Sequence, residues 1–448
     1  MAYLDHAATT PMVPEALTAL EANLRITGNP SSLHAHGRAA RRVVEESRES
    51  LAASLGCSPT EVVFTAGGTE ADNLAVKGLA WARRSERGSR TRILVSAVEH
   101  HAVLDPTIWL AEQQGFTVEL LPVDRLGRVD LDYARALLLT NSDSIAVLSV
   151  MWANNEVGTV QPVEALAQAA REAGVPFHCD AVQALGSLPI DFAASGVDAA
   201  TISGHKVGGP RATGALLLRR GLTPTPVLHG GGQERGVRSG TLDAPGAAGL
   251  AAAVAVAVAN QERHAARVSA LRHDLVARVR VAVPEAVLNG DPDELSGACD
   301  PGVGLGGVQS GYRRLPGNAH FSFPGCEGDA LLMLLDAQGV ECSTGSACQA
   351  GVARPSHVLL AMGADTARAQ GTLRFSLGHN STPADVDALL DVLPAAVARA
   401  RRAGELPRLG AARRLAHTLG MESFAPQLLS PQLLSPQSLS PQSLLPES

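Results

Sequence analysis

One lysine at the end of an apolar run could carry out covalent chemistry. Residues 199–203 are small or β-branched, and His205, Lys206 and a glycine-rich turn follow them directly. Burial lowers the pKa of a lysine, and the neutral amine is a nucleophile that forms Schiff bases with aldehydes. Lys206 is therefore a candidate anchor for an aldehyde cofactor. The alternative is a lysine whose amine reaches from the strand end into water.

Polar residues also follow several other expected strands. Thr69, His100, Asn155 and Asp180 each come at or just after the end of an apolar run. Ligands of open α/β sheets bind outside the carboxyl ends of the strands, so we expect these side chains to gather near Lys206. Each of them alone has an ordinary explanation, such as a helix cap, a surface histidine or a turn.

The side chains that would meet there suit a phosphorylated pyridine. Asp180 could keep a pyridine nitrogen protonated, and Gln183, three residues on, could bond the ring oxygen. His100 could stack on the ring and move protons. Ser203 and His205 could add donors for a phosphate.

The turn 66–69 offers a second set of phosphate donors. Its glycines would let backbone N–H groups at a helix N-terminus approach an anion. We expect the helix to cover 70–84, with Thr69 as its N-cap. A well-capped helix without a ligand is the alternative.

Two residues nearer the C-terminus could act on a substrate. Cys348 lies between Gly345 and Gly351 in small, polar sequence that predicts an exposed loop, where a thiol can react. An incidental loop cysteine is the alternative, whereas Cys342 at a strand end is predicted to be core. Arg374 interrupts an apolar strand, and its buried guanidinium would need either a substrate carboxylate or an internal carboxylate.

The elements that would position these residues alternate along the first 260 residues. This alternation predicts an α/β fold with a largely parallel sheet. The first thirty residues are expected to be irregular, with turn chemistry at 28–32, and helices are expected at 38–55, 162–173 and 244–259. Strands are expected at 61–64, 93–96, 116–121, 144–151, 175–178, 199–203 and 215–218.

A smaller second domain is expected after residue 261. A long helix to about 283, strands at 320–323 and 373–377, and helices at 329–338 and 385–402 would form it. Residues 291–317 are rich in Gly and Pro and predict an inserted surface loop. From residue 426 a five-residue, proline-led repeat predicts disorder.

Composition excludes several classes of protein. The formal net charge of −7 over 448 residues gives no electrostatic case for binding nucleic acid or an anionic membrane. The basic stretch 399–414 is better explained as a solvated helix. Six cysteines without a CxxC pair predict neither a disulfide scaffold nor a zinc site. No signal peptide is evident at residue 1, so we expect a cytoplasmic protein.

A series of motifs in one order resembles the cysteine desulfurases of the NifS/IscS type, within the class V aminotransferases. These motifs cover roughly residues 2–400 and together are highly specific. They lie at 3–10, 28–32, 64–70, 99–100, 154–158, 180–183, 203–206, 230–235, 238–241 and 345–348.

The resemblance implies a pyridoxal 5'-phosphate (PLP) enzyme of fold type I, like the aspartate aminotransferases. A large domain would cover 16–260 and a smaller α+β domain 261–410, which would carry the mobile cysteine loop. Residues 1–15 would pack with the small domain. Residues 411–448 would form a disordered tail.

The resemblance also assigns roles to residues. Lys206, His100 and Cys348 would be catalytic, and Asn155 and Arg374 would hold the substrate. Thr241 would bind phosphate from the partner subunit of a homodimer. The full cofactor-binding set would be Gly68, Thr69, His100, Asn155, Asp180, Gln183, Ser203, His205, Lys206 and Thr241.

The implied reaction takes sulfur from L-cysteine, leaves alanine and puts a persulfide on Cys348. An acceptor protein, either an iron–sulfur scaffold or a tRNA thiolation enzyme, would receive that sulfur. No intrinsic metal is expected, although Cys348 could ligate an iron–sulfur cluster shared with a scaffold. The alternatives are a selenocysteine lyase, another class V lyase or aminotransferase, or a sulfur-relay protein with a degenerate site. Leu33, where the family commonly has Arg, and the 291–317 insertion depart from the pattern.

Overall fold

The strands predicted between residues 61 and 218 form one seven-stranded sheet in the computed structural model, which describes residues 1–293, 311–345 and 355–418. Five neighbouring strands are parallel, and β8 pairs antiparallel with both β7 and β2. The predicted α/β fold with a mostly parallel sheet is confirmed. Across the sheet the order is β2 (Val62–Thr65), β8 (Gly214–Leu218), β7 (Ala199–Ser203), β6 (Phe177–Asp180), β5 (Ile145–Ser149), β3 (Arg92–Ser96) and β4 (Thr117–Leu121).

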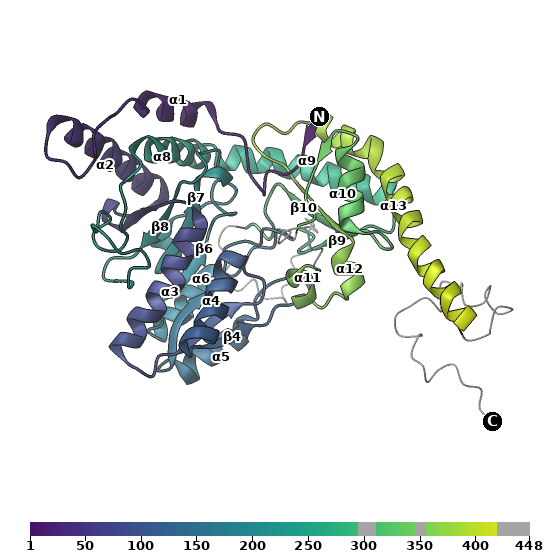
Figure 1. Cartoon of the computed structure of the whole chain (residues 1–448), viewed down its shortest axis with the longest axis horizontal. Helices are drawn as coiled ribbons and strands as arrows, with labels where there is room; N and C mark the ends of the chain where they lie inside the picture. The colour runs from purple at the N-terminus through teal and green to yellow at the C-terminus, as the bar shows by residue number, and fades with distance from the viewer. Residues whose placement is uncertain (294–310, 346–354, 419–448) are drawn as a thin grey trace.

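Helices cover both faces of this sheet, which explains why its central strands are buried along their whole length (Figure 1). On one face lie α3 (Gly68–Glu86) and α4 (His101–Gln114). The other face packs against α2 (Ala35–Leu55), α5 (Leu131–Asn141), α6 (Val163–Glu172) and α8 (Ala244–Ala259). The short α7 (Phe192–Ser195) precedes β7. Two apolar cores therefore hold the sheet from either side.

A third core belongs to a smaller α+β unit that begins with α9 (Gln261–Ala282), on the other side of the molecule in Figure 1. Its sheet has the antiparallel order β12-β10-β9. The remaining elements are β9 (Val287–Asn289), β10 (Asn318–Ser322), α10 (Gly328–Asp336), β11 (Val340–Glu341), α11 (His357–Ala361), α12 (Thr366–Gln370), β12 (Thr372–Ser376) and α13 (Pro383–Thr418).

The N-terminal segment joins the two units. Its strand β1 (Ala2–Tyr3) pairs in parallel with β11, and Leu4 is buried in the third core. The chain then crosses to α1 (Pro14–Asn23), which packs on α8 (Figure 1). Residues 5–10 thus lie between the large sheet and the small unit. The domain boundaries at 15/16, 260/261 and 410/411 stay predictions.

Three sequence predictions about elements are wrong. The first thirty residues are not irregular throughout, because α1 begins at Pro14, a favoured first helical residue. The N-cap of α3 is Gly67, whose φ of 124° suits only glycine, so Thr69 lies inside the first helical turn. The last helix, α13, continues past the predicted end near Arg402 to Thr418.

The prediction that residues 291–317 form a surface loop is wrong at both described ends of this segment, because charged residues there are buried. Asp291 is fully buried, where it pairs with Arg128 and, at 3.1 Å, with Arg313. Arg314 is also fully buried, and it donates to three backbone carbonyls. Buried charges persist when ion pairs and hydrogen bonds satisfy them, and here partners distant in sequence do so. Residues 294–310 lie outside the described part of the chain.

None of the described helices is by itself long and apolar enough to cross a membrane. The pair α8 and α9, bent by 70° at their junction, passes that test only when the two are taken together.

Candidate active site

One cavity of about 380 Å³ lies at the carboxyl ends of the parallel strands, against the N-terminal segment and β12. The structure brings ten of the residues singled out from the sequence into its wall. These are Gly68, Thr69, His100, Asn155, Asp180, Gln183, Ser203, His205, Lys206 and Arg374. The polar residues at the strand ends therefore meet around one cavity, as predicted, whereas their individual roles stay predictions.

Lys206 follows β7 directly, in the short turn Gly204–Lys206. Its Nζ donates to the carbonyl oxygens of Ala7 at 2.5 Å and Ala8 at 2.9 Å, so the amine does not reach into water. Burial and, to a smaller extent, the charge of Arg374 lower the pKa of Lys206 to about 8, while Asp180 and Asp5 oppose the shift. Near neutral pH a substantial fraction of this amine is unprotonated and nucleophilic.

Asp180 is the last residue of β6 and is only 6% exposed. Its Oδ1 accepts a hydrogen bond of 2.9 Å from the backbone N–H of Val182. Burial raises the pKa of Asp180 to about 6, although this hydrogen bond and Lys206 oppose the shift. Above that pH the carboxylate puts a negative charge at the base of the cavity, where it could pair with a cationic ring nitrogen.

The two histidines of the cavity are held as neutral rings. The Nδ1 of His100 accepts from the backbone N–H of Ala102 at 3.1 Å and caps α4, which leaves the ring proton on Nε2. His205 Nδ1 lies 3.3 Å from the hydroxyl of Thr9. Burial, and then the charge of Lys206, lowers the pKa of each histidine to about 4. Neutral rings of this kind can stack on a planar ligand or exchange a proton with it.

An anion cradle lies at the N-terminus of α3. The N–H groups of the first helical turn have no intrahelical acceptor, and the helix dipole favours negative charge there. A side chain at Gly68 would approach Val182 Cγ2 to 3.0 Å and Ser203 Cβ to 3.4 Å, so only glycine keeps this corner open. Because Thr69 is not the cap, its side chain is free of that role and lines the cavity.

Arg374 stands in β12 and is 4% exposed. Its Nη2 pairs with Asp5 Oδ1 at 3.0 Å, and its Nη1 donates to the backbone oxygen of Asn155 at 3.0 Å. Of the two anions considered from the sequence, the structure shows the internal carboxylate. A substrate carboxylate at the same guanidinium stays a prediction.

Of the two remaining predicted site residues, one lies elsewhere and the other lies outside the described residues. Thr241 is exposed and lines a separate hollow with Thr65, Ala66 and Arg238. Cys348 lies outside the described residues, while Gly345, just before that gap, lines the cavity.

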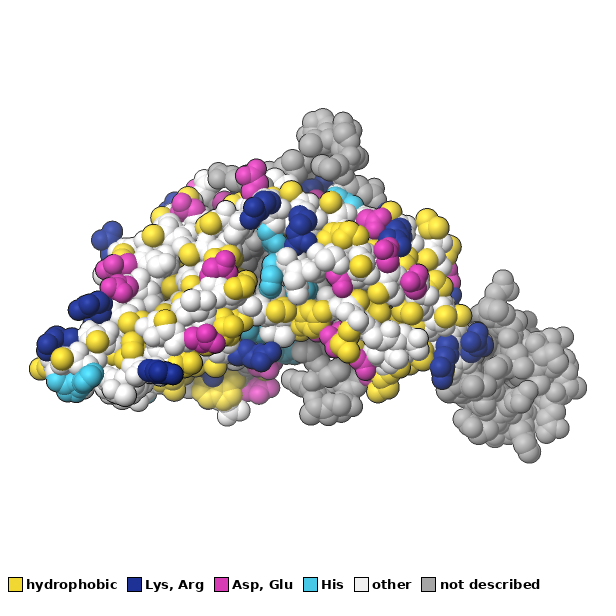
Figure 2. Space-filling model, turned by 90° about the horizontal axis from the view of Figure 1, so that it is seen from above, with side chains coloured by type: hydrophobic (Ala, Val, Ile, Leu, Met, Phe, Trp, Pro, Cys, Tyr) yellow, Lys and Arg dark blue, Asp and Glu magenta, His cyan; other side chains and the backbone are white. Residues whose placement is uncertain are grey.

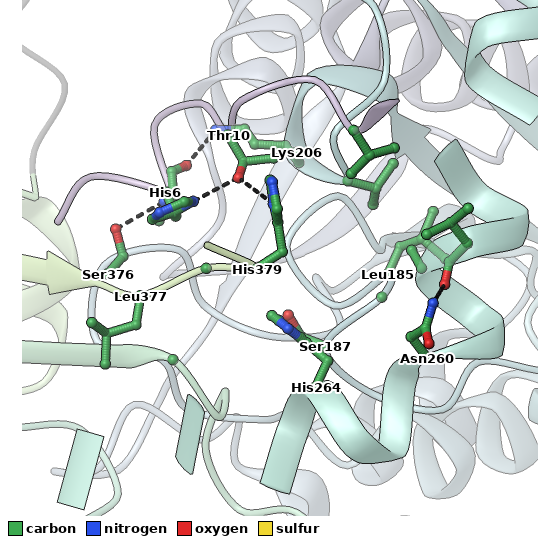
Figure 3. Close-up of a pocket in the computed structure, with 18 of the residues that line it drawn as sticks. His6, Thr10, Leu185, Ser187, Lys206, Asn260, His264, Ser376, Leu377 and His379 are labelled. Atoms are coloured by element: carbon green, nitrogen blue, oxygen red, sulfur yellow. Dashed lines mark hydrogen bonds between the residues drawn. The ribbon is translucent and has the colours of Figure 1, made fainter. Parts of the chain in front are cut away.

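A second cavity of about 380 Å³ is lined in part by His6, Ala7 and Thr10 of the N-terminal segment (Figure 3). Thr10 Oγ1 is hydrogen-bonded to His6 Nδ1 at 2.6 Å and to His379 Nδ1 at 3.4 Å, and His264 faces the same space from α9. Figure 2 shows histidine side chains in a hollow near the middle of the molecule. This cavity shares Lys206 with the first but lacks Asp180, His100 and the anion cradle.

Three features of the active cavity were not predicted from the sequence. Asp72, buried in its wall, lies one helical turn after Gly68, a spacing that could have placed both on one face. The carbonyls of Ala7 and Ala8 hold Lys206, and Asp5 holds Arg374. Nothing in the local sequence pattern of residues 5–8 signals these long-range contacts.

Comparison with known proteins decides the family. The family model described as aminotransferase class-V matches residues 2–296 and 304–389. The chain belongs to the class-V aminotransferase family. An "IscS-like cysteine desulfurase" of Mycobacterium tuberculosis is 56% identical over 92% of this chain and 100% of its own length.

Solved structures of this family have the same fold. A "NifS-like protein" is 34% identical, with a TM-score of 0.78 over 89% of this chain and 100% of its own. A structure titled "SspA in complex with cysteine" is 31% identical, with a TM-score of 0.68 over 84% of this chain and 99% of its own.

Class-V aminotransferases use pyridoxal phosphate, and the cavity fits that group. A nucleophilic amine, a buried carboxylate and an open helix N-terminus face one space of suitable volume. Those three features match the aldehyde, the pyridine nitrogen and the phosphate.

Proposed function

We propose that this protein is a cysteine desulfurase, which converts L-cysteine to L-alanine and retains the sulfur as a persulfide on Cys348. The observation that carries this proposal is the partly neutral amine of Lys206 in one cavity with Asp180 and Arg374. The relative at 56% identity is named a cysteine desulfurase, and a structural neighbour at 31% identity is titled as a complex with cysteine. These names favour the desulfurase over a selenocysteine lyase or an aminotransferase.

The residues of the cavity would hold the cofactor in one orientation. Lys206 would bind its aldehyde carbon, Asp180 its ring nitrogen and Gln183 its ring oxygen. The N–H groups of Gly68 and Thr69, with Ser203 and His205, would bind its phosphate. Pyridoxal phosphate, when bound, supplies an electron sink for the bonds around the substrate's Cα.

Proton movements would fall to two groups of the chain. The amine of Lys206, once free of the cofactor, can take a proton from the substrate because its pKa is near 8. His100 carries its ring proton on Nε2 and could return a proton to the product. Arg374 and Asn155 would orient the substrate through its carboxylate.

The sulfur step is balanced without an outside oxidant. The thiolate of Cys348 would attack the substrate sulfur, and an S–S bond would form as the Cβ–S bond breaks. The electron pair of the broken bond stays with Cβ, which takes up one proton to become the methyl group of alanine. Carbon is reduced and Cys348 is oxidised to the persulfide, which would pass to an iron–sulfur scaffold or a tRNA thiolation enzyme.

We expect Cys348→Ser to bind the cofactor and substrate normally but to lose alanine and sulfide production by about a thousandfold or more, because a hydroxyl does not accept sulfur in this way. The measurement is alanine release from cysteine with a thiol reductant present. Cys57→Ser, a half-buried thiol away from the cavity, is the matched control and should turn over normally. Undiminished cysteine turnover by Cys348→Ser would refute the persulfide assignment, and undiminished selenocysteine turnover alone would indicate a lyase.

We further propose a homodimer in which Thr241 completes the phosphate site of the partner subunit. Thr241 supports this proposal because its side chain is exposed and does not line the active cavity of its own subunit. Arg238, three residues earlier, pairs with Glu70 at 2.7 Å and holds this segment beside α3. Thr241→Ala should weaken cofactor binding about 10- to 100-fold, the range for one hydrogen bond to a charged group. A monomeric enzyme in sedimentation experiments, with full cofactor affinity in Thr241→Ala, would contradict this arrangement.

A further inference from the structure

The guanidinium of Arg374 is already partly occupied by another part of the chain. Asp5 Oδ1 lies 3.0 Å from its Nη2, and the side chains of Arg374 and Asp5 are 5% and 20% exposed. Its Nε is buried and has no hydrogen-bond partner among the described residues. On the edge of the guanidinium formed by Nε and Nη2, Nη2 is therefore paired with Asp5 and Nε has no partner among the described residues.

That edge is the one a carboxylate binds most strongly. A bidentate pair side-on to arginine uses the parallel N–H bonds of Nε and Nη2. In the structure Asp5 bonds Nη2 and does not bond Nε. A second carboxylate that takes both nitrogens must therefore share or displace the contact with Asp5.

The backbone fixes Asp5 in this place. Ser376 N donates to Leu4 O at 2.7 Å, and Ala7 N donates to Ser376 Oγ at 2.8 Å. Hydrogen bonds to β12 therefore hold the chain on both sides of Asp5. Asp5 itself forms a parallel bridge with Ser376. Arg374 is two residues before Ser376 and lies on the same face of the strand, which brings its side chain beside Asp5.

The same segment also contacts the catalytic amine. The carbonyls of Ala7 and Ala8 accept hydrogen bonds from Lys206 Nζ, two and three residues after Asp5. Lys206 therefore lies between two opposed charges, since Arg374 lowers and Asp5 raises its pKa. A carboxylate that replaces Asp5 at Arg374 would keep the local charge balanced.

We propose that Asp5 is a positioning residue, a displaceable counter-ion that holds Arg374 ready and is exchanged for the α-carboxylate of the amino-acid substrate. This inference rests on the proposed function only in taking an α-amino acid as the ligand. Asp5 keeps the buried guanidinium paired before substrate binds. Because its carboxylate occupies part of the same edge of the guanidinium, Asp5 competes with the incoming carboxylate and thereby weakens substrate affinity.

The test is L-alanine binding to the holoenzyme, followed by the change in cofactor absorbance. We expect Asp5→Asn to bind L-alanine about five- to tenfold more tightly, because the neutral amide still accepts a hydrogen bond from Arg374 but is displaced from the guanidinium more readily than a carboxylate. Asp5→Glu retains the charge and should restore the wild-type dissociation constant. Glu341→Gln removes a carboxylate from neighbouring β11 that forms no ion pair with Arg374 in the described structure, and it should bind like wild type.

A double-mutant cycle with Arg374→Ala shows whether Asp5 acts through the guanidinium. In that background Asp5→Asn should no longer change alanine affinity. The proposal is overturned if Asp5→Asn binds alanine like wild type, if it binds as weakly as Arg374→Ala, or if its effect persists without Arg374. If the proposed desulfurase function were wrong, the result would be distinguishable from these. The wild type would then bind alanine but would release none from cysteine.

Discussion

Lys206→Ala is expected to lose the absorbance of the covalently bound cofactor and at least about 10²- to 10⁴-fold of cysteine turnover, the range for removing a general base alone. The amine of Lys206 is held by two carbonyls at the mouth of the cavity, and burial lowers its pKa to about 8. Loss of that amine would remove both the covalent anchor and the group that moves the substrate proton.

The chain offers a sharp control for this prediction because it contains two lysines, Lys77 and Lys206. Lys77 lies on α3 with its amine 4.6 Å from the ring centre of Trp109, outside the cavity. Borohydride reduction of the holoenzyme should fix the cofactor to the peptide of Lys206 and leave that of Lys77 unlabelled. Full turnover in Lys206→Ala, or a label on Lys77, would contradict the central assignment.

The sequence was sufficient to locate the cavity because its wall is built from strand ends. Buried strands of a parallel sheet are mostly apolar, so the polar residues that follow each apolar run mark the edge of the sheet. His100, Asp180 and Lys206 were found in this way, and the structure places all three around one cavity. The mostly parallel sheet follows from the same alternation of strands and helices.

What the sequence could not supply depends on contacts between distant residues. Asp5 and Arg374 are separated by 369 positions and meet only because the N-terminal segment pairs with β11 and bridges to β12. The ends of 291–317 are buried for the same reason, since Arg128 lies far from Asp291 in sequence. At Gly67 the error was local, because a helix can begin at a glycine with positive φ two residues before a good capping residue.

Burial also sets the charge states of the site, which residue types alone do not reveal. Both His100 and His205 have a pKa lowered to about 4 by burial, so each is neutral at physiological pH. The pKa of Asp180 moves in the other direction, to about 6. One physical cause, the cost of burying a charge, therefore gives two neutral bases and one weakened acid in the same cavity.

Asp180→Asn is expected to reduce turnover by about 10²- to 10³-fold, the range for one preorganised electrostatic contact at a reacting group. An amide in place of the carboxylate would no longer stabilise a protonated ring nitrogen. Asp143→Asn, an exposed carboxyl on the surface, serves as control. The measurements are cysteine turnover and cofactor affinity across pH 5 to 8. Wild-type values in Asp180→Asn would refute the ring-nitrogen role.

The pH dependence separates this role from a purely structural one. As the pH rises through about 6, the stability of the protein without cofactor should fall, whereas its affinity for the cofactor should rise. Without cofactor, Asp180 has a pKa raised above its unfolded value, so its contribution to stability is full at low pH and is lost as the pH rises through about 6. With cofactor, ionised Asp180 is the favourable partner, so affinity should fall as the pH drops through that value. Asp180→Asn should flatten both profiles. If Asp180 only packed the base of the sheet, the substitution would change the stability of the apoprotein and leave the pH dependence of cofactor affinity as it is in the wild type.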